Sequence, residues 1–279
     1  MAAPTGMIMD TGIRTTIRMG TAMTIATITA TGPDIPMTEP SAPRLPLSPQ
    51  ALYRLQAFLS PAFPIGAFTY SHGLEQVIEQ GGVANARDLD IWLREILRFG
   101  AGRSDAILLK ETHQAALAGD GDTVAELRDL GLALQPSRER HLESSAQGSA
   151  FFRAICNSWM PSADTQAARL FHEAAADENQ SWPYPVVLGL AAAAHGLPVD
   201  AALHCFLHAF AANLISVAVR VVPLGQSDGQ KVLAGLEPVI FEIAEAAEAA
   251  GLDDLGTSTF LADIASMAHE TQYSRLFRS

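Results

Sequence analysis

The chain has 279 residues, of which 48% are hydrophobic and 7% aromatic, and its formal net charge at pH 7 is −12. This amount of apolar side chain is sufficient for a globular core, built mainly from Ala, Leu, Val and Ile. The acidic balance argues against general nucleic-acid binding, which requires a basic surface. Two cysteines are too few for a disulfide framework or a thiolate zinc site and suit a reducing compartment, so we expect a cytoplasmic protein.

The first part of the chain differs in composition from the rest. Residues 1–46 are rich in Thr, Met and Pro and show no sustained helical or strand period. Arg14 and Arg18 precede an apolar run, but threonines interrupt this run and no clean cleavage site follows, which argues against a targeting peptide. We interpret residues 1–46 as a disordered low-complexity extension and residues 47–279 as one domain.

From Ser48 onward, helical patterns alternate with short breaks of Gly and Pro. We find no alternating strand pattern and no Asn-Gly hairpin signal. The sequence therefore predicts an all-α fold, a single domain of roughly ten helices. The expected helices cover residues 50–59, a short segment ending at Gly81, 86–99, 105–118, 122–134, 138–160, 163–177, a short segment ending at Gly196, 199–222, 230–236, 238–250 and 257–267, with Asn85, Ser137 and Ser162 as N-caps.

The segment from Ser60 to Glu75 organises the first half of the domain. Pro61 and Pro64 prevent a regular helix, because each lacks an N–H and fixes its own φ, and Gly66 lets the chain turn. The pattern that follows predicts one short helix carrying four polar or aromatic side chains: Tyr70, Ser71, His72 and Glu75. The spacing of three residues allows a pair between His72 and Glu75. The alternative is a buried connection in which Ser71 and His72 make internal hydrogen bonds.

The helix expected over residues 199–222 is the most apolar part of the chain, but polar residues interrupt it, which predicts a core helix rather than a membrane span. Asp200, His204 and His208 share one of its faces at a spacing of four residues and could ligate nickel, iron or zinc. Two helical turns, about 12 Å, are long for one ion. We interpret the three residues as a polar stripe and predict no metal site and no cofactor, with a helical metalloenzyme as the alternative.

The sequence offers no catalytic set. Ser71 and His72 are adjacent, so on a helix they point about 100° apart, and no G-x-S-x-G motif occurs. No glycine-rich phosphate loop occurs either, and Lys110 and Lys231 are the only lysines. We therefore predict that the protein is not an enzyme and does not itself hydrolyse nucleotides.

Two basic regions are candidates for protein recognition. Arg220 ends an apolar run just before Pro223, so it is expected either to meet main-chain carbonyls near Pro223 or to face a partner together with Gln226 in the next turn. The C-terminal segment combines aromatic, apolar and arginine residues, a mixture typical of binding hot spots. We expect it to be mobile in the free protein and ordered on a partner. Its candidate residues are Tyr273, Arg275, Leu276, Phe277 and Arg278.

The Ser60–Glu75 segment resembles the N-terminal signature of the urease accessory protein UreF family. Three later stretches support the resemblance in the same order: Glu139 to Gly148, Arg220 to Gln226, and Tyr273 to Ser279. The resemblance covers roughly Leu45 to Ser279, and its first and last motifs are the specific ones.

The resemblance implies a function for these candidates. Proteins of this family assist nickel insertion into apo-urease, form homodimers, bind the accessory protein UreD (UreH in some organisms) and recruit the GTPase UreG. We therefore expect partner-binding roles for the Tyr70–Glu75 residues, a GTPase-facing role for Arg220 and Gln226, since a charged residue beside an exposed turn can reach outward, and a UreD-facing role for the C-terminal segment because of its composition. Nucleic acid and membranes are not among the expected partners.

Overall fold

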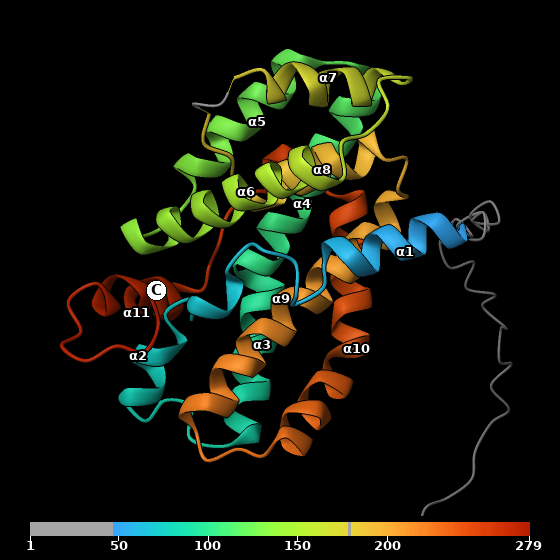
Figure 1. Cartoon of the computed structure of the whole chain (residues 1–279). Helices are drawn as coiled ribbons and strands as arrows, with labels where there is room; N and C mark the ends of the chain where they lie inside the picture. The colour runs from blue at the N-terminus through green and yellow to red at the C-terminus, as the bar shows by residue number, and fades with distance from the viewer. Residues whose placement is uncertain (1–46, 178–179) are drawn as a thin grey trace, which may run out of the picture. The chain divides into compact units, whose positions relative to one another are not determined.

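The computed structural model describes residues 47–177 and 180–279, which belong to one compact unit, Pro46–Ser279. The expectation of a disordered extension over residues 1–46 lies outside the described residues. The described part is helical and contains no strand, which confirms the all-α prediction (Figure 1). Its helices are α1 Pro49–Phe58, η1 Ala67–Thr69, α2 Leu74–Glu79, α3 Ala86–Phe99, α4 Ala101–Ala118, α5 Gly121–Ala133, α6 Arg138–Ser158, α7 Gln166–Ala175, α8 Tyr184–Ala194, α9 Val199–Val221, α10 Gln226–Ala249, η2 Leu252–Asp254 and α11 Phe260–His269.

Helices α4 and α8 form the centre of the core. Every residue of α8 from Pro185 to Ala194 is buried, and its alanines and Gly189 let α4 approach closely. Helices α3, α9 and α10 pack around one part of α4, while α5 and α7 lie at the other end of the bundle and α6 crosses α8 (Figure 1). Because small residues fill the centre, the two helix backbones come close enough to exclude larger side chains.

Local sequence signals set several helix boundaries. The side chain of Asn85 accepts hydrogen bonds from the N–H groups of Arg87 and Asp88, and Ser137 caps α6 in the same way, which confirms both predicted N-caps. Helix α7 begins later than predicted, because the hydroxyl of Thr165, not that of Ser162, accepts the hydrogen bond that starts it. Helix α4 begins at Ala101, so Gly102 lies inside the helix.

Helix α10 corrects a sequence prediction. Two helices separated at Pro238 were expected, but one helix runs from Gln226 to Ala249. Proline removes one helical hydrogen bond, and contacts with α9 and α3 hold both halves in line. One turn before the proline, Arg94 Nη2 donates to the carbonyl of Gly235 at 2.7 Å.

Helix α9 is, among the described residues, the one helix long and apolar enough to cross a membrane by length and composition alone. It packs against α10, α4, α2 and α3, and half of its most apolar window is buried inside the bundle. These contacts are those of a core helix.

The segment after Gly66 differs from the prediction of one short helix. Gly66 has φ +72°, and a single 3₁₀ turn, η1, follows it. Tyr70 to Gly73 then form a loop in which His72 has φ +59° and Gly73 φ +75°, and α2 begins only at Leu74. Tyr70, Ser71 and His72 therefore do not lie on a helix with Glu75, and the predicted His72–Glu75 pair does not form. A Cβ on Gly73 would lie 2.8 Å from the main-chain nitrogen of Ser266, so α2 meets α11 at this glycine.

Replacing Gly66 by Val is expected to destabilise the protein by about 1–3 kcal/mol, because a β-branched residue is strained at this φ. No atom lies within 4 Å of a Cβ built at this position, so backbone strain is the whole effect. Chemical denaturation of the purified variant measures it. Gly66→Ala should cost less, and a Val variant as stable as the parent would show that the loop adopts another conformation.

Candidate protein-binding site

The C-terminal segment lies along the loop that follows Gly66. The N–H of Ser71 donates to the main-chain oxygen of Ser279 at 2.7 Å, and the Ser71 hydroxyl contacts the same oxygen. One residue further out, the N–H of Arg278 donates to the carbonyl of Thr69 at 2.8 Å. Ser71 and Ser279 are fully buried. The segment is therefore docked on its own fold, and the expectation that it is mobile in the free protein is wrong.

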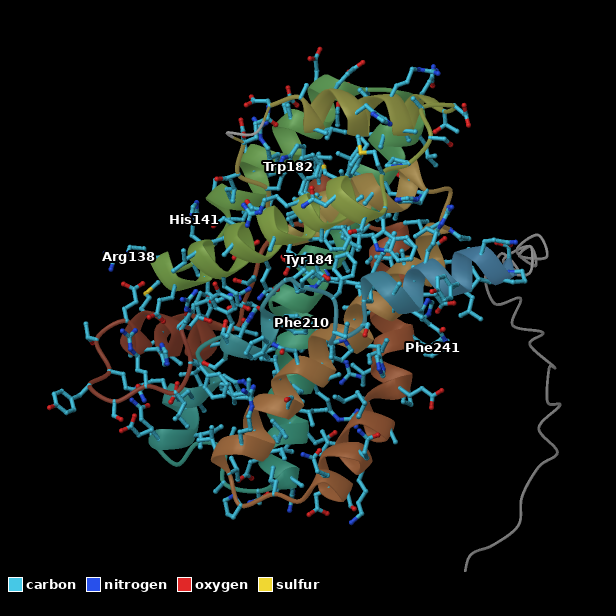
Figure 2. All side chains as sticks on the ribbon, in the orientation of Figure 1. Arg138, His141, Trp182, Tyr184, Phe210 and Phe241 are labelled. Carbon is cyan, nitrogen blue, oxygen red and sulfur yellow. The ribbon has the colours of Figure 1, made fainter. Side chains whose placement is uncertain are left out.

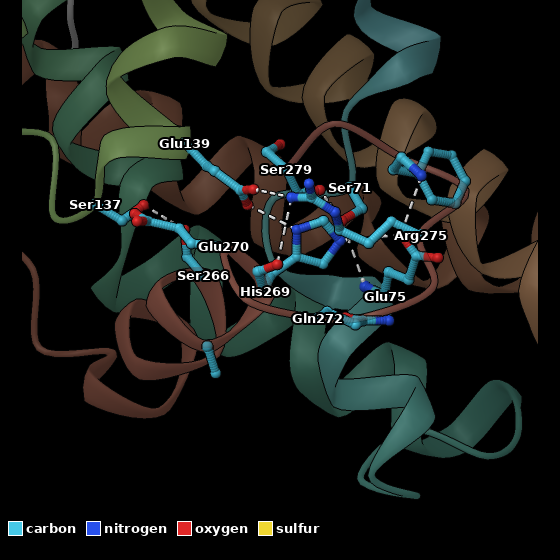
Figure 3. Close-up of polar contacts among 12 residues, drawn as sticks. Ser71, Glu75, Ser137, Glu139, Ser266, His269, Glu270, Gln272, Arg275 and Ser279 are labelled. Atoms are coloured by element: carbon cyan, nitrogen blue, oxygen red, sulfur yellow. Dashed lines mark hydrogen bonds and ion pairs between the residues drawn. The ribbon is translucent and has the colours of Figure 1, made fainter.

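Glu75 of α2 holds the middle of the segment. Its carboxylate accepts the N–H of Leu276 at 2.7 Å and that of Phe277 at 3.1 Å. The same carboxylate accepts a hydrogen bond from His269 Nε2 at 3.0 Å (Figure 3). Glu75 is 5% exposed, so these charge-assisted bonds form in the interior, where they are strong.

His269, at the end of α11, lies between two carboxylates. Its Nδ1 is 2.7 Å from Glu139 of α6, and Arg275 Nη1 donates to the other Glu139 oxygen at 2.6 Å (Figure 3). Ionised carboxylates only accept hydrogen bonds, so when Glu75 and Glu139 are both ionised these contacts require a proton on each imidazole nitrogen. An imidazolium and one guanidinium then balance the charges of Glu75 and Glu139. The cluster joins α2, α6, α11 and the C-terminal segment.

A second buried cluster lies beside the first. Glu143 forms an ion pair with Arg140, accepts the hydroxyl of Ser279 at 2.7 Å and lies 3.6 Å from His72 Nδ1. Burial by itself raises the pKa of Glu143, but the charge of Arg140 and the hydrogen bonds from His72 and Ser279 reverse this and hold it well below its usual value. Burial, aided by Arg140, lowers the pKa of His72 to about 4 against the opposing effect of Glu143. His72 is therefore neutral at pH 7.

Arg220 ties the loop and the C-terminal segment together from outside. Its Nη2 donates to the carbonyl of Phe68 at 3.0 Å, its Nε donates to that of Ser216, and its guanidinium lies 4.5 Å from the centre of the Phe277 ring. We expected Arg220 to meet main-chain carbonyls near Pro223. It donates instead to the carbonyl of Ser216 in its own helix and to that of Phe68 in η1. The side chain remains exposed, so it can contact a partner while it holds Phe277.

We call the residues that hold the C-terminal segment the clamp: Ser71, Glu75, Glu139, Glu143, Arg220 and His269. Apolar side chains are exposed next to this clamp. Tyr273 is fully exposed and Leu276 is 75% exposed, whereas Phe277 is buried. The outer face of α11 continues the apolar surface with four exposed residues: Phe260, Leu261, Ile264 and Met267. An exposed apolar face of this extent, beside a rigidly held segment, is typical of a protein-binding surface.

The structure brings most of the predicted residues together around the C-terminal segment. Ser71, His72, Glu75 and Phe277 are buried and shape the clamp, and Tyr70 is buried beside them. Arg275 and Arg278 lie at its surface. Gln226 is exposed at the first position of α10 and makes no hydrogen bond with the clamp within the described ranges.

Sequence reasoning did not identify Glu139, Glu143 and His269 as site residues. Glu139, Glu143 and Gln147 are spaced by four residues and so share one face of α6, and all three are buried. A buried polar face at this spacing is a signal that could have been recognised. His269 is a single histidine near the end of a short helix, and nothing in the local sequence distinguishes it.

The metal-binding alternative gains no support from the geometry. His204 Nδ1 is 2.7 Å from the main-chain oxygen of Asp200, and the His204 ring packs on Phe241. His208 is exposed one turn further along α9. In the part of the chain that the structure describes, no group of three or more His, Cys, Asp or Glu side chains is arranged to hold a metal ion.

The fold and this site define an all-helical protein in which buried carboxylates hold the C-terminal segment beside an exposed apolar helix face. The model of the UreF family matches residues 83–237, and the chain belongs to this family. A urease accessory protein UreF of Rhodopseudomonas palustris strain BisA53 is 49% identical over 242 residues, covering 87% of this chain and 98% of the relative. UreF of strain BisB5 is 46% identical over 88% of this chain and 98% of the relative, and UreF of Methylobacterium radiotolerans is 46% identical over 81% and 96%.

Proposed function

We propose that this protein is a cytoplasmic chaperone of urease maturation, which assists nickel insertion by binding other proteins and not by catalysis. Its membership of the UreF family and the names of its relatives support this function. The proposed partners are UreD (UreH), the GTPase UreG, apo-urease through the accessory complex, and a second copy of the chain. No chemical step is assigned to the protein itself.

The observation that carries the proposal is that some side chains of the C-terminal segment are buried and hold it in place, while others are exposed. Ser279 and Phe277 face inward and hold the segment, while Tyr273 and Leu276 point away from the clamp. The segment therefore presents its outer side chains in a fixed conformation, so binding costs little ordering entropy. We assign this surface, together with the exposed face of α11, to UreD.

Leu276→Ala and Tyr273→Ala are expected to reduce co-purification with UreD at least tenfold while the melting temperature stays within about 2 °C of the parent. Each removes exposed apolar area that becomes buried in the complex, worth about 1.5–3 kcal/mol when fully desolvated. Pull-down with tagged UreD and a thermal melt measure the two effects. Tyr53→Ala on α1, also exposed, is the matched control and should bind normally. Normal UreD binding by a variant that carries both Leu276→Ala and Tyr273→Ala would exclude this surface as the UreD-binding site.

We assign Arg220 and Gln226 to the surface that meets UreG. Gln226→Ala is the clean test, since the side chain is exposed and makes no hydrogen bond within the described residues. It should weaken UreG recruitment and urease activation severalfold with fold and UreD binding intact. Arg220→Ala should act more strongly, because it also releases the Phe68 carbonyl and the Phe277 ring. If only Arg220→Ala has an effect, and it also lowers the melting temperature, Arg220 is structural and the assignment fails.

A further inference from the structure

Two cavities meet at charged side chains in the interior of the helical body. The larger, about 250 Å³, lies between the loop before η1 and helices α6, α8 and α9, and the smaller, about 180 Å³, between α3, α4 and α11. His72, Asp105 and Arg140 line both cavities. The lining of the larger cavity also includes the exposed side chains of Phe68 and His208, so it is open to solvent there.

The walls of the larger cavity are mostly apolar. Phe58 and Ile65 contribute from the loop side, and Phe206, Phe210 and Leu214 from α9. Tyr184 enters from α8, and both Tyr184 and Phe210 are labelled in Figure 2. Polar groups gather at the floor, where His72, Asp105, Arg140 and Glu143 converge. Apolar walls with a few convergent polar groups are the usual features of a small-molecule site.

The charges at the floor do not balance. Arg140 is 5% exposed and pairs with Glu143, and His72 is neutral at pH 7. The Asp105 carboxylate makes no hydrogen bond or ion pair with any described residue. Once Asp105 is ionised, the floor therefore lacks one positive charge. Asp105 is partly buried, and a charge that has lost part of its contact with water without gaining a partner is costly, so this site favours a cation.

The titration of Asp105 agrees with this imbalance. Burial raises its pKa to about 7, with Arg140 opposing and Glu143 reinforcing the shift. The other titratable groups that line the two cavities are Tyr184 of α8, His208 of α9 and Asp263 of α11. Tyr184 and Asp263 are acids that are neutral or negatively charged, so neither supplies positive charge, and burial raises the pKa of both and favours their neutral forms.

We propose that the larger cavity binds a small aliphatic primary ammonium ion, with the ammonium group on the Asp105 carboxylate and the hydrocarbon chain along the apolar wall. An organic anion would be repelled by Asp105 and Glu143, since the charge of Arg140 is already matched. A neutral alcohol would fill the apolar part without supplying the missing charge. None of the side chains assigned to UreD or UreG lines this cavity, although Phe68 and Ser216, which do, accept hydrogen bonds from Arg220.

The test uses the full chain and n-butylammonium chloride, followed by isothermal titration calorimetry at pH 8. Saturable binding at one site is expected, and Asp105→Asn should weaken it at least tenfold. Asp263→Asn is the matched control, because Asp263 lines only the smaller cavity. Butyrate and 1-butanol have the same chain length and should each bind at least tenfold more weakly than the amine.

The pH dependence in the unmodified protein gives a second test that needs no variant. The amine stays protonated across this range, since alkylammonium groups titrate near pH 10.4. Asp105 takes up a proton as the pH falls through about 7, so affinity should fall about tenfold from pH 8 to pH 6. An affinity that is independent of pH, or equal binding of 1-butanol, would overturn the proposal. Absence of saturable amine binding would also overturn it.

Discussion

Gly148→Ala is expected to destabilise the protein by more than about 4 kcal/mol, a size reached by few single substitutions. A Cβ at this position would lie 1.9 Å from the carbonyl oxygen of Trp182 and 2.8 Å from its carbonyl carbon. Both are main-chain atoms, so no side-chain rotation relieves the overlap. Relief requires α6 to move away from the Trp182–Pro183 segment that leads into α8, and this opens the core contacts of both helices.

Thermal melting followed by circular dichroism measures the effect. Since about 1 kcal/mol corresponds to 2–4 °C for a domain of this size, the melting temperature should fall by roughly 10 °C or more. Gly251→Ala is the control: no atom lies within 4 Å of its Cβ position and its φ is −118°, so it should stay within about 0.5 kcal/mol of the parent. A Gly148→Ala variant that melts with the parent would show that α6 and the Trp182 segment are further apart than described.

Features that depend on neighbouring residues in the sequence were predictable. The helix class, the Asn85 and Ser137 caps and the end of α9 before Pro223 follow from periodicity and local hydrogen bonding. The continuity of α10 was not predictable, because packing against α3 and α9 overrides the local effect of Pro238. The left-handed conformation of His72 was missed for a related reason: contacts with α6 and Ser279 hold it there, and no local motif requires it.

For the candidate site, too, contacts between segments far apart in the sequence could not be predicted. The sequence identified both partners of the clamp, Glu75 and the C-terminal segment, but as separate surfaces, because their contact spans about two hundred residues of chain. The aromatic and arginine content of the segment predicts binding, yet does not tell whether it binds its own fold or another protein. The structure shows that Phe277 and Arg275 bind its own fold. Leu276 and Tyr273 stay exposed, and this exposure is the basis for the proposed UreD surface.

His269→Ala is expected to cost about 3–5 kcal/mol and to release the C-terminal segment. The substitution removes the cation between Glu75 and Glu139, and an ion pair broken from one side leaves uncompensated charge in the interior. Arg275 balances only one of the two carboxylates, and it is partly exposed. The segment should therefore separate from α2, and the amides of Leu276 and Phe277 should lose protection against hydrogen exchange.

Three measurements separate this account from simple loss of packing. In the parent protein at pH 7, ¹⁵N NMR of the His269 ring should show protons on both nitrogens, as its two carboxylate partners require. In a double-mutant cycle, Glu75→Gln should cost less in the His269→Ala background than in the parent, with a coupling of about 0.5–3 kcal/mol. His141→Ala, at an exposed position of α6, is the matched control and should leave stability and amide protection unchanged. A neutral His269 ring together with full protection of Leu276 and Phe277 in His269→Ala would show that apolar contacts of Phe277, and not the charge between the two glutamates, hold the segment.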